Sequence, residues 1–368
     1  MAGRRWTQRP ASRSQSPERL LPSLLGLAAA TAVVCGWVEA ASAQVSPPQP
    51  PDSTPLPTAN PAASAQRGTN PQLLYSMEAH ETAVDSLAFS PDGEVLVSGG
   101  SFNDPTVVFW SVENGKKLDR LRAQREAVLT LAFSPDGNLL VSSGSDGGIN
   151  LWNWQTGEFQ ASFLENASNI LSLAITPDSE VLVSGGLDGI KVWDLIPQRP
   201  LYTLASYGLP VYSLAMNPNG YIFASGDNSG RVIFWNLRTG TIISEFSAHT
   251  ESIRGLVYTP DGNRLITGSN DRTVKVWDLL SGQLLYTFTG HTGPIRGLVL
   301  NPDGETLASA SNDGVRLWNI RTGEPLSWLP NDDWVESVAF SPDGRLLASG
   351  AFNRTINVWQ LDAVTSEQ

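Results

Sequence analysis

A single pattern of residues recurs seven times between residues 72 and 362. In the copy at 249–278, an apolar run leads into the turn Thr259-Pro260-Asp261-Gly262, and a second apolar run follows it. These runs are short and are bounded by Gly, Pro, Asn or Asp, which favours strands over helices. Each copy closes on a tryptophan, and successive tryptophans are 41 or 42 positions apart: Trp110, Trp152, Trp193, Trp235, Trp277, Trp318 and Trp359. A fixed period of this length predicts a repeat architecture in which each copy is a small sheet packed against its neighbours.

The first turn of every copy also contains a proline: Pro91, Pro135, Pro177, Pro218, Pro260, Pro302 and Pro342. This pattern resembles the WD40 repeat, and the resemblance covers residues 72–362. It implies an all-β fold, a seven-bladed β-propeller of four-stranded antiparallel blades. In blade 5 we expect the four strands at 253–258, 264–267, 273–277 and 284–287.

The last copy ends at Trp359, and the nine residues after it do not look like a fourth strand. Residues 72–77 (QLLYSM) instead resemble 283–288 (QLLYTF), which include the fourth strand of blade 5. We predict that residues 72–77 complete the last blade beside 355–359 and close the ring, as in the WD40 family. Closure removes exposed sheet edges that would otherwise invite aggregation. Residues 363–368 are then a C-terminal tail.

The first 43 residues have the pattern of a secretory leader. Five arginines lie within residues 1–19, an apolar stretch covers 20–38, and Ala41-Ser42-Ala43 follows. These features predict a signal peptide that is cleaved after Ala43; the alternative is an uncleaved signal anchor. Either places the propeller in the periplasm, outside the cell or in another exoplasmic compartment. Residues 44–71 are rich in Pro, Ala and Ser, and we interpret them as a disordered linker.

The charge and cysteine content exclude some classes of partner and chemistry. The chain has a net charge of −12, and beyond residue 43 it has 19 basic and 34 acidic residues, a net charge of −15. This argues against nucleic acid or anionic lipid as the main ligand. The only cysteine, Cys35, lies in the leader, so the remainder has no thiol nucleophile and no disulfide.

The three histidines occupy one repeated position. WD40 blades often link a His, a Ser or Thr, an Asp and the Trp by hydrogen bonds, and the resemblance implies three complete sets: His80, Ser98, Asp104 and Trp110; His249, Thr267, Asp271 and Trp277; His291, Ser309, Asp313 and Trp318. Blades 2, 3, 4 and 7 lack the His, and Ser229 and Asn353 occupy the Asp position in blades 4 and 7. No histidine remains for a catalytic triad or a zinc site, so we expect no catalytic residue, metal or cofactor.

In the WD40 family, ligands often bind the top face around the central channel. Mapped onto this sequence, the positions there include Asp85, Leu129, Leu171, Tyr212, Arg254, Arg296, Trp334, Glu336 and Phe352. Arg254 and Arg296 fall in adjacent blades, as do Glu336 and Asp85 after ring closure. Arginines beside exposed aromatics have the composition of a binding hot spot. The alternative is that Arg and Glu of adjacent blades only pair with each other.

We therefore expect a non-catalytic interaction scaffold, exported across the membrane, that binds a protein or peptide on its top face. The propeller is expected to be monomeric and to contact a membrane only through an uncleaved leader. One alternative is a propeller enzyme that acts on a glycan, with Asp85 and Glu336 as its carboxylate pair. Another is a structural spacer in an envelope assembly.

Overall fold

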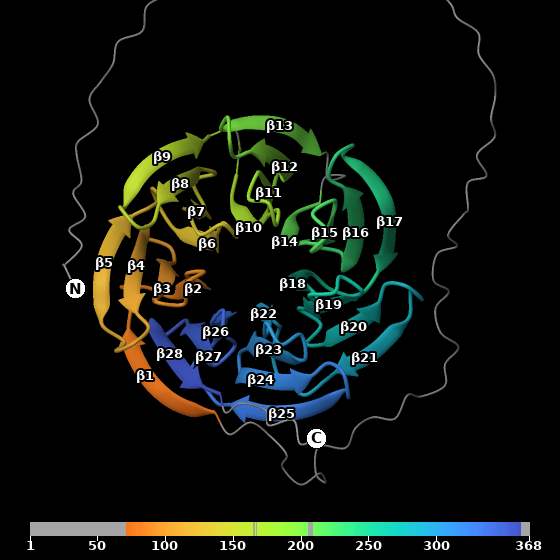
Figure 1. Cartoon of the computed structure of the whole chain (residues 1–368). Coiled ribbons are helices and arrows are strands. Elements are labelled where there is room, and N and C mark those ends of the chain that lie inside the picture. Colours follow the sequence, from red (N-terminus) through yellow and green to blue (C-terminus); the bar gives the residue numbers. More distant parts are fainter. Residues whose placement is uncertain (1–70, 165, 167, 205–208, 362–368) are drawn as a thin grey trace, which may run out of the picture.

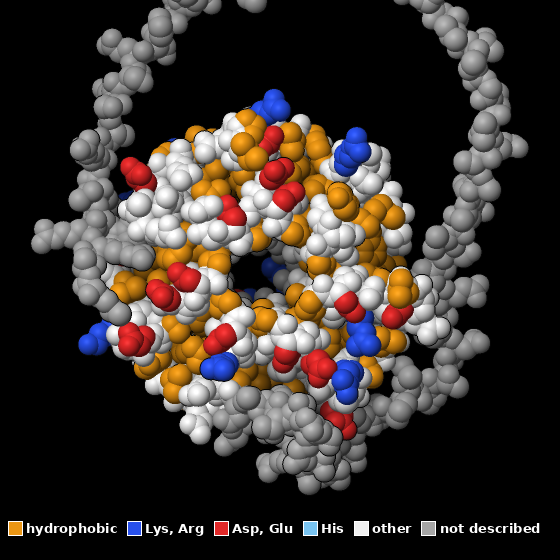
Figure 2. Space-filling model, viewed as in Figure 1, with side chains coloured by type: hydrophobic (Ala, Val, Ile, Leu, Met, Phe, Trp, Pro, Cys, Tyr) orange, Lys and Arg blue, Asp and Glu red, His pale blue; other side chains and the backbone are white. Residues whose placement is uncertain are grey.

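The computed structural model of the chain describes residues 71–164, 166, 168–204 and 209–361. Within these residues the chain forms 28 β-strands, arranged as seven four-stranded antiparallel sheets around a common axis (Figure 1). The space-filling view shows that the centre of the ring is open (Figure 2). The predicted seven-bladed propeller is confirmed.

Six blades are each built from four consecutive strands, the first innermost and the fourth at the rim (Figure 1). Blade 1 contains β2 (Val84–Phe89), β3 (Val95–Gly100), β4 (Thr106–Ser111) and β5 (Lys117–Arg122). Blade 2 contains β6 (Val128–Phe133), β7 (Leu139–Gly144), β8 (Ile149–Asn153) and β9 (Glu158–Phe163). Blade 3 contains β10 (Ile170–Ile175), β11 (Val181–Gly186), β12 (Gly189–Asp194) and β13 (Arg199–Leu204).

The second half of the ring repeats this order. Blade 4 contains β14 (Val211–Met216), β15 (Ile222–Asp227), β16 (Arg231–Asn236) and β17 (Thr241–Ser247). Blade 5 contains β18 (Ile253–Tyr258), β19 (Arg264–Ser269), β20 (Val274–Asp278) and β21 (Leu284–Phe288). Blade 6 contains β22 (Gly297–Leu300), β23 (Thr306–Ser311), β24 (Gly314–Asn319) and β25 (Glu324–Leu329). Blade 7 combines β26 (Val335–Phe340), β27 (Leu346–Ala351) and β28 (Thr355–Gln360) with β1 (Gln72–Glu78).

The turn between the first two strands of each blade follows from its sequence. In blade 1 the Ser90 hydroxyl donates to the Asp92 carboxylate, and the Gly93 N–H donates to the Ser90 carbonyl at 2.8 Å. Gly93 has a φ of 74°, which glycine adopts without steric cost. The equivalent residue of blade 3 is Ser179, which holds a φ of 63° without being glycine. These turns define one face of the propeller; we call the opposite face, where the loops between blades enter the innermost strands, the top face.

The core consists of apolar clusters between neighbouring blades. At the junction of blades 2 and 3, for example, Val141 and Ile149 pack with Leu182 and Trp193, and all four side chains are buried. A single blade has two apolar faces and cannot cover both by itself. The ring therefore stabilises each blade through its two neighbours, which is the expectation for a repeat fold.

The predicted closure by the N-terminal strand is confirmed. β1 pairs antiparallel with β28, with Met77 opposite Ile356 and Glu78 opposite Thr355. The Ala79 N–H extends this pairing by donating to the Arg354 carbonyl at 2.9 Å. The last blade is thus made from both ends of the propeller sequence.

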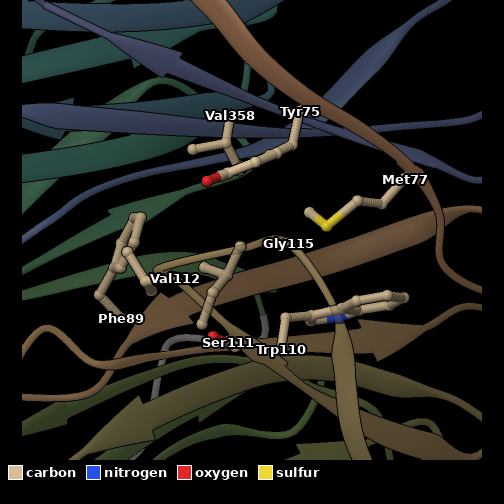
Figure 3. A pocket seen from close by; sticks show the side chains of 9 residues that line it. Tyr75, Met77, Phe89, Trp110, Ser111, Val112, Gly115 and Val358 are labelled. Atoms are coloured by element: carbon tan, nitrogen blue, oxygen red, sulfur yellow. The ribbon is translucent and has the colours of Figure 1, made fainter.

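β1 also contacts blade 1, so it joins the first and last blades. The Tyr75 hydroxyl donates to the Glu113 carbonyl at 2.6 Å. A Cβ at Gly115 would lie only 2.9 Å from the Tyr75 ring, so this turn needs glycine for the close approach as well as for its φ of 67°. A cavity of about 10 Å³ remains between Tyr75, Met77 and Trp110 (Figure 3). It has room for at most one water molecule, so it is a packing gap and not a ligand site.

The predicted boundaries within the propeller are close to those observed. In blade 5, β19 continues two residues beyond the predicted end because Ser269 still pairs with Ile253. The predicted leader at 1–43, nearly all of the linker at 44–71 and the tail at 363–368 lie outside the described residues. The part of the chain that the structure describes contains no apolar helix of membrane-spanning length.

Candidate interaction surface at the mouth of the central channel

The innermost strand carries a β-bulge at its second residue in blades 1, 2, 3, 4, 5 and 7. In blade 5, Ile253 pairs with Ser269 and Gly255 pairs with Gly268, which leaves Arg254 as the extra residue. The same register shift occurs in the other five of these blades. In blade 6 the corresponding residue, Arg296, directly precedes β22, and its N–H donates to the Ala310 carbonyl at 2.9 Å. A bulge redirects one side chain out of the regular alternation of a strand.

These seven positions are the ones that the sequence placed around the channel. We call them the bulge ring: Asp85, Leu129, Leu171, Tyr212, Arg254, Arg296 and Glu336. All seven residues are half-buried. Six are the second residue of the innermost strand of their blade and Arg296 directly precedes β22, and these strands surround the centre of the ring (Figure 1). Lys or Arg side chains are visible inside the opening (Figure 2). The mouth of the channel is therefore lined by side chains whose identity differs from blade to blade.

The arginines of the bulge ring make different contacts. The Arg254 guanidinium lies over the Tyr212 ring, 3.9 Å from its centroid, so blades 4 and 5 contribute one cation–π pair. Arg296 forms an ion pair with Glu336 at 3.1 Å and also lies 5.0 Å from the centroid of the Trp334 ring. The pairing of Arg and Glu across adjacent blades, which was the alternative interpretation of these positions, thus occurs at Arg296.

The carboxylates of the bulge ring have perturbed acidities. Burial raises the pKa of Asp85 to about 6; the neighbouring Glu336 adds to this, while Ser101 and Arg296 oppose it. Burial also raises the pKa of Glu336, against the attraction of Arg296. Arg254 has a lowered pKa because of burial, and the charge of Arg296 contributes in the same direction. The charges of blades 5, 6, 7 and 1 therefore act on one another across the channel mouth.

Exposed aromatic side chains extend this surface onto blade 7. Trp334, in the loop that enters β26, is 43% exposed, and its ring centroid lies 5.9 Å from that of Phe352, in the turn between β27 and β28. Phe102, in the corresponding turn of blade 1, is also exposed. The sequence mapping missed Phe102, although an aromatic residue in a polar turn was a signal that could have found it. Leu129 and Leu171 make the side of the ring in blades 2 and 3 apolar.

The polar sets of blades 1, 5 and 6 form continuous chains of hydrogen bonds. In blade 1 the Trp110 indole N–H donates to the Ser98 hydroxyl at 2.9 Å, Ser98 lies 2.8 Å from His80 Nε2, and His80 Nδ1 lies 2.9 Å from Asp104. Burial alone would raise the pKa of Asp104, but hydrogen bonds, among them those from Thr106 and His80, hold it at about 2. An ionised Asp104 accepts a hydrogen bond from His80 Nδ1–H, so Nε2 accepts from the Ser98 hydroxyl. The indole N–H, the hydroxyl and the imidazole N–H of this set then each donate one hydrogen bond.

Blades 5 and 6 repeat this arrangement. His249 lies 2.8 Å from Asp271 and 2.7 Å from Thr267, and His291 lies 2.6 Å from Asp313 and 2.7 Å from Ser309. The indole N–H groups of Trp277 and Trp318 donate to Thr267 and Ser309 at 3.1 and 2.8 Å. The two histidines, Thr267 and Ser309 are buried, so these sets support the fold from within the blades.

In blades 2 and 4, other residues take the place of a missing member of the set: the histidine in blade 2 and the aspartate in blade 4. In blade 2 the Gln124 amide donates to Ser142 at 3.1 Å, which the sequence had given only as the loss of a histidine. In blade 4, Asp227 accepts from Ser229 at 2.7 Å and from Arg231 at 3.2 Å, so the carboxylate has moved two residues earlier. Among the described residues, no group of three His, Cys, Asp or Glu is placed to hold a metal ion.

Comparisons with known proteins agree with this architecture. The family model described as "WD domain, G-beta repeat" matches residues 71–111, 115–153 and 157–194. The model described as "IFT122 first beta-propeller" matches residues 210–368. Together these matches span both halves of the ring. The comparison with curated proteins found no match.

Proposed function

Since this chain belongs to the WD40-repeat family, whose propellers generally mediate protein–protein interactions, we propose that it is a non-catalytic platform that binds a protein or peptide on its top face. The observation that carries this proposal is the channel mouth, where Arg254 stacks on Tyr212 and Arg296 lies beside Trp334.

The composition of this surface supports binding. Interface hot spots are enriched in Trp, Tyr and Arg, since these side chains combine a large apolar area with hydrogen-bond donors. Stacking on aromatic rings holds both guanidinium groups in place before a ligand arrives, which lowers the entropy cost of association. Single exposed aromatic residues scattered over a surface do not indicate a binding site. Here the exposed aromatic side chains adjoin two arginines and an open channel.

We also propose that the propeller works outside the cytoplasm. This rests on the basic, apolar and small-residue segments of 1–43, which precede the described part of the chain. Cell fractionation of the tagged full-length chain tests it: recovery in the periplasmic, membrane or secreted fraction is expected. Recovery in the cytoplasm with an intact N-terminus would contradict export.

A crosslinking pull-down from exoplasmic extract tests the platform itself. The bait is the chain from residue 44 onward, as wild type and as the double variant Arg254→Ala, Arg296→Ala. The control removes two arginines from turns on the opposite face, Arg238→Ala with Arg345→Ala, both exposed. We expect a protein that wild type and the control capture and the channel variant loses. If no captured protein distinguishes the folded variants, the top-face platform is wrong and a structural spacer becomes the better explanation.

A second candidate function is a glycan-acting enzyme that uses Asp85 and Glu336. The raised pKa of both carboxyl groups favours it, because a general acid must hold a proton near neutral pH. The ion pair between Glu336 and Arg296 gives the same carboxylate a structural role. Release of reducing sugar from polysaccharides by wild type, lost in Asp85→Asn and Glu336→Gln, would establish the enzyme; retained binding with no turnover would support the platform.

A further inference from the structure

Arg254 and Arg296 differ in how their charges are balanced. The Arg296 guanidinium has a carboxylate partner, Glu336, at 3.1 Å. Among the described residues, no carboxylate lies within ion-pair distance of Arg254, whose guanidinium is held by the face of the Tyr212 ring. Of the bulge-ring cations, Arg254 is therefore the one available to an incoming anion.

Arg254 lies where its surroundings disfavour a positive charge. Its side chain is half-buried, and burial together with the charge of Arg296 lowers its pKa, so the surroundings disfavour the cation. Arginine nevertheless stays protonated at neutral pH. A half-buried charge without a partner is unfavourable, and a bound anion would remove that penalty. Glu336 attracts the Arg254 cation only from beyond ion-pair distance, because it binds Arg296 at 3.1 Å, and Asp85 is hydrogen-bonded to Ser101.

The stacking geometry indicates the kind of anion. The guanidinium carbon of Arg254 lies over the Tyr212 ring, 3.9 Å from its centroid. A cation–π contact uses none of the guanidinium N–H donors for hydrogen bonding, so the planar set of donors is left for a ligand. This planar fork matches the two oxygens of a carboxylate. The exposed pair Trp334 and Phe352, beyond blade 6 on blade 7, offers an apolar surface near the same mouth.

We propose that the channel mouth recognises an acidic side chain of a peptide, with Arg254 binding the carboxylate and Trp334 and Phe352 packing against an apolar residue of the same peptide. This inference rests on the proposed platform function. Capture of a C-terminal carboxylate usually relies on a nest of backbone N–H groups. Here the donor is a side-chain guanidinium, so an Asp or Glu within the peptide is the better fit.

The net negative charge of the chain does not oppose this contact at close range. Physiological salt screens exposed charges beyond about 8 Å. The overall charge of −12 therefore slows the approach of an acidic peptide more than it weakens the bound state. An acidic peptide is then bound at the channel mouth, where Arg254 provides a cation, and is repelled by the acidic remainder of the surface.

Selection from a displayed library of random linear peptides tests the proposal. The full chain is the target, and binders of an Arg254→Gln variant are removed before each round. Arg272→Gln is the matched control, since Arg272 is an exposed arginine in the β19–β20 turn of the same blade and face. Thermal melts of each variant serve to check that it is folded. We expect the enriched peptides to share an Asp or Glu close to a large apolar residue.

Calorimetry on one enriched peptide then isolates the contact. Replacing its acidic residue by the matching amide is expected to weaken binding to wild type by about tenfold to a hundredfold. Arg254→Gln should produce a similar loss, Arg272→Gln none, and the amide peptide should lose little more on the Arg254→Gln variant, because the two changes remove the same interaction.

Three outcomes would overturn the inference: acid and amide peptides that bind equally, binding that requires a free C-terminus or a phosphate group, or no enriched peptide that depends on Arg254. These differ from a failure of the platform. If a protein partner is lost with Arg254→Ala and Arg296→Ala, but replacing its acidic residues has no effect, the platform stands and the carboxylate is wrong.

Discussion

At the scale of single residues, the bulge ring shows how one backbone position can carry different chemistry in each repeat. The same bulge presents a carboxylate at Asp85, an apolar side chain at Leu129 and a cation at Arg254. Because the bulge sets the direction of the side chain, substitutions there change the channel surface without changing strand pairing. Strand pairing and the chemistry of the channel surface are thus separable at these positions.

Asp85 gives a prediction about pH and stability. Folding raises the pKa of Asp85 from 3.8 to about 6, so the folded state binds this proton more tightly than the unfolded state. Proton binding by Asp85 therefore adds to the free energy of unfolding below pH 4, and this addition is lost as the pH rises through 6. The rise in pKa corresponds to about 3 kcal/mol at most, and solvent screening reduces it to about 1–2 kcal/mol. Asp85→Asn should raise the unfolding free energy by that amount at pH 7.5 and change it little at pH 4.

Denaturant titrations at the two pH values measure this difference. Ser101→Ala, which removes a hydrogen bond to Asp85, serves as a control expected to shift the transition in the opposite sense at pH 7.5. An Asp85→Asn effect of equal size at both pH values would show that the acidity of Asp85 is not perturbed by folding.

The closing tryptophans give a second prediction. The indole N–H of Trp110 donates to Ser98 at 2.9 Å, whereas the buried indole N–H of Trp359 has no hydrogen-bond partner. Both Trp→Phe changes remove apolar volume, but only Trp110→Phe also removes a hydrogen bond. We expect Trp110→Phe to cost about 1–2 kcal/mol more than Trp359→Phe in urea unfolding. Equal losses would mean that the indole bond contributes nothing net.

At the scale of elements, β1 determines whether the ring is closed. It supplies the outer edge of blade 7 through β28 and a contact with blade 1 through Tyr75. Met77 is buried in the cluster shared by these two blades. Without β1 the outer edge of β28 is exposed and the core between blades 7 and 1 loses one wall.

Deleting residues 72–78 should therefore destabilise the propeller far more than deleting residues 44–70. Loss of Met77 alone corresponds to about 2–5 kcal/mol, before any effect of the unpaired strand edge. Thermal melts of the two truncations measure this, and Met77→Ala gives the share due to packing. Coincident melts for the two truncations would contradict closure by β1.

At the scale of the whole molecule, the His-centred hydrogen-bond sets are distributed unevenly around the ring, and we expect local stability to follow them. Blades 1, 5 and 6 contain complete His-centred chains of hydrogen bonds, and blade 2 has a partial substitute in Gln124. In a repeat protein each blade contributes its own stability and that of two interfaces, so local differences remain visible. The bulge-ring arginines lie in blades 5 and 6, which both contain a complete His-centred set.

Hydrogen exchange should reveal this asymmetry. A blade without a complete His-centred set lacks a buried interaction of about 1–3 kcal/mol. We therefore expect backbone amides in blades 3 and 4 to exchange faster than those in blades 5 and 6, with blade 2 in between. Mass spectrometry of exchanged peptides resolves the blades. The substitution His249→Ala should raise exchange in blade 5 most. Uniform exchange around the ring would show that it opens only as one unit.

The sequence alone determined the number of repeats and the positions of their turns and strands, through local, periodic signals such as Trp277 at the end of a repeat or Pro260 in a turn. The resemblance to the WD40 repeat that these signals carry then implied the four-stranded blades, the closing strand and the positions around the channel. Periodicity specifies which face a residue occupies, because strand alternation and turn geometry act over a few residues. The same resemblance implied the His-centred sets, whose members occupy matching positions within each repeat.

Only the tertiary structure decided how the channel residues partner one another. Arg254 stacks on Tyr212, 42 positions away, while Arg296 pairs with Glu336, 40 positions away. The sequence placed both arginines at equivalent positions and could not distinguish them. Their difference arises because the closed ring brings each side chain against the adjacent blade, and which groups meet there depends on distances between repeats that no local pattern encodes.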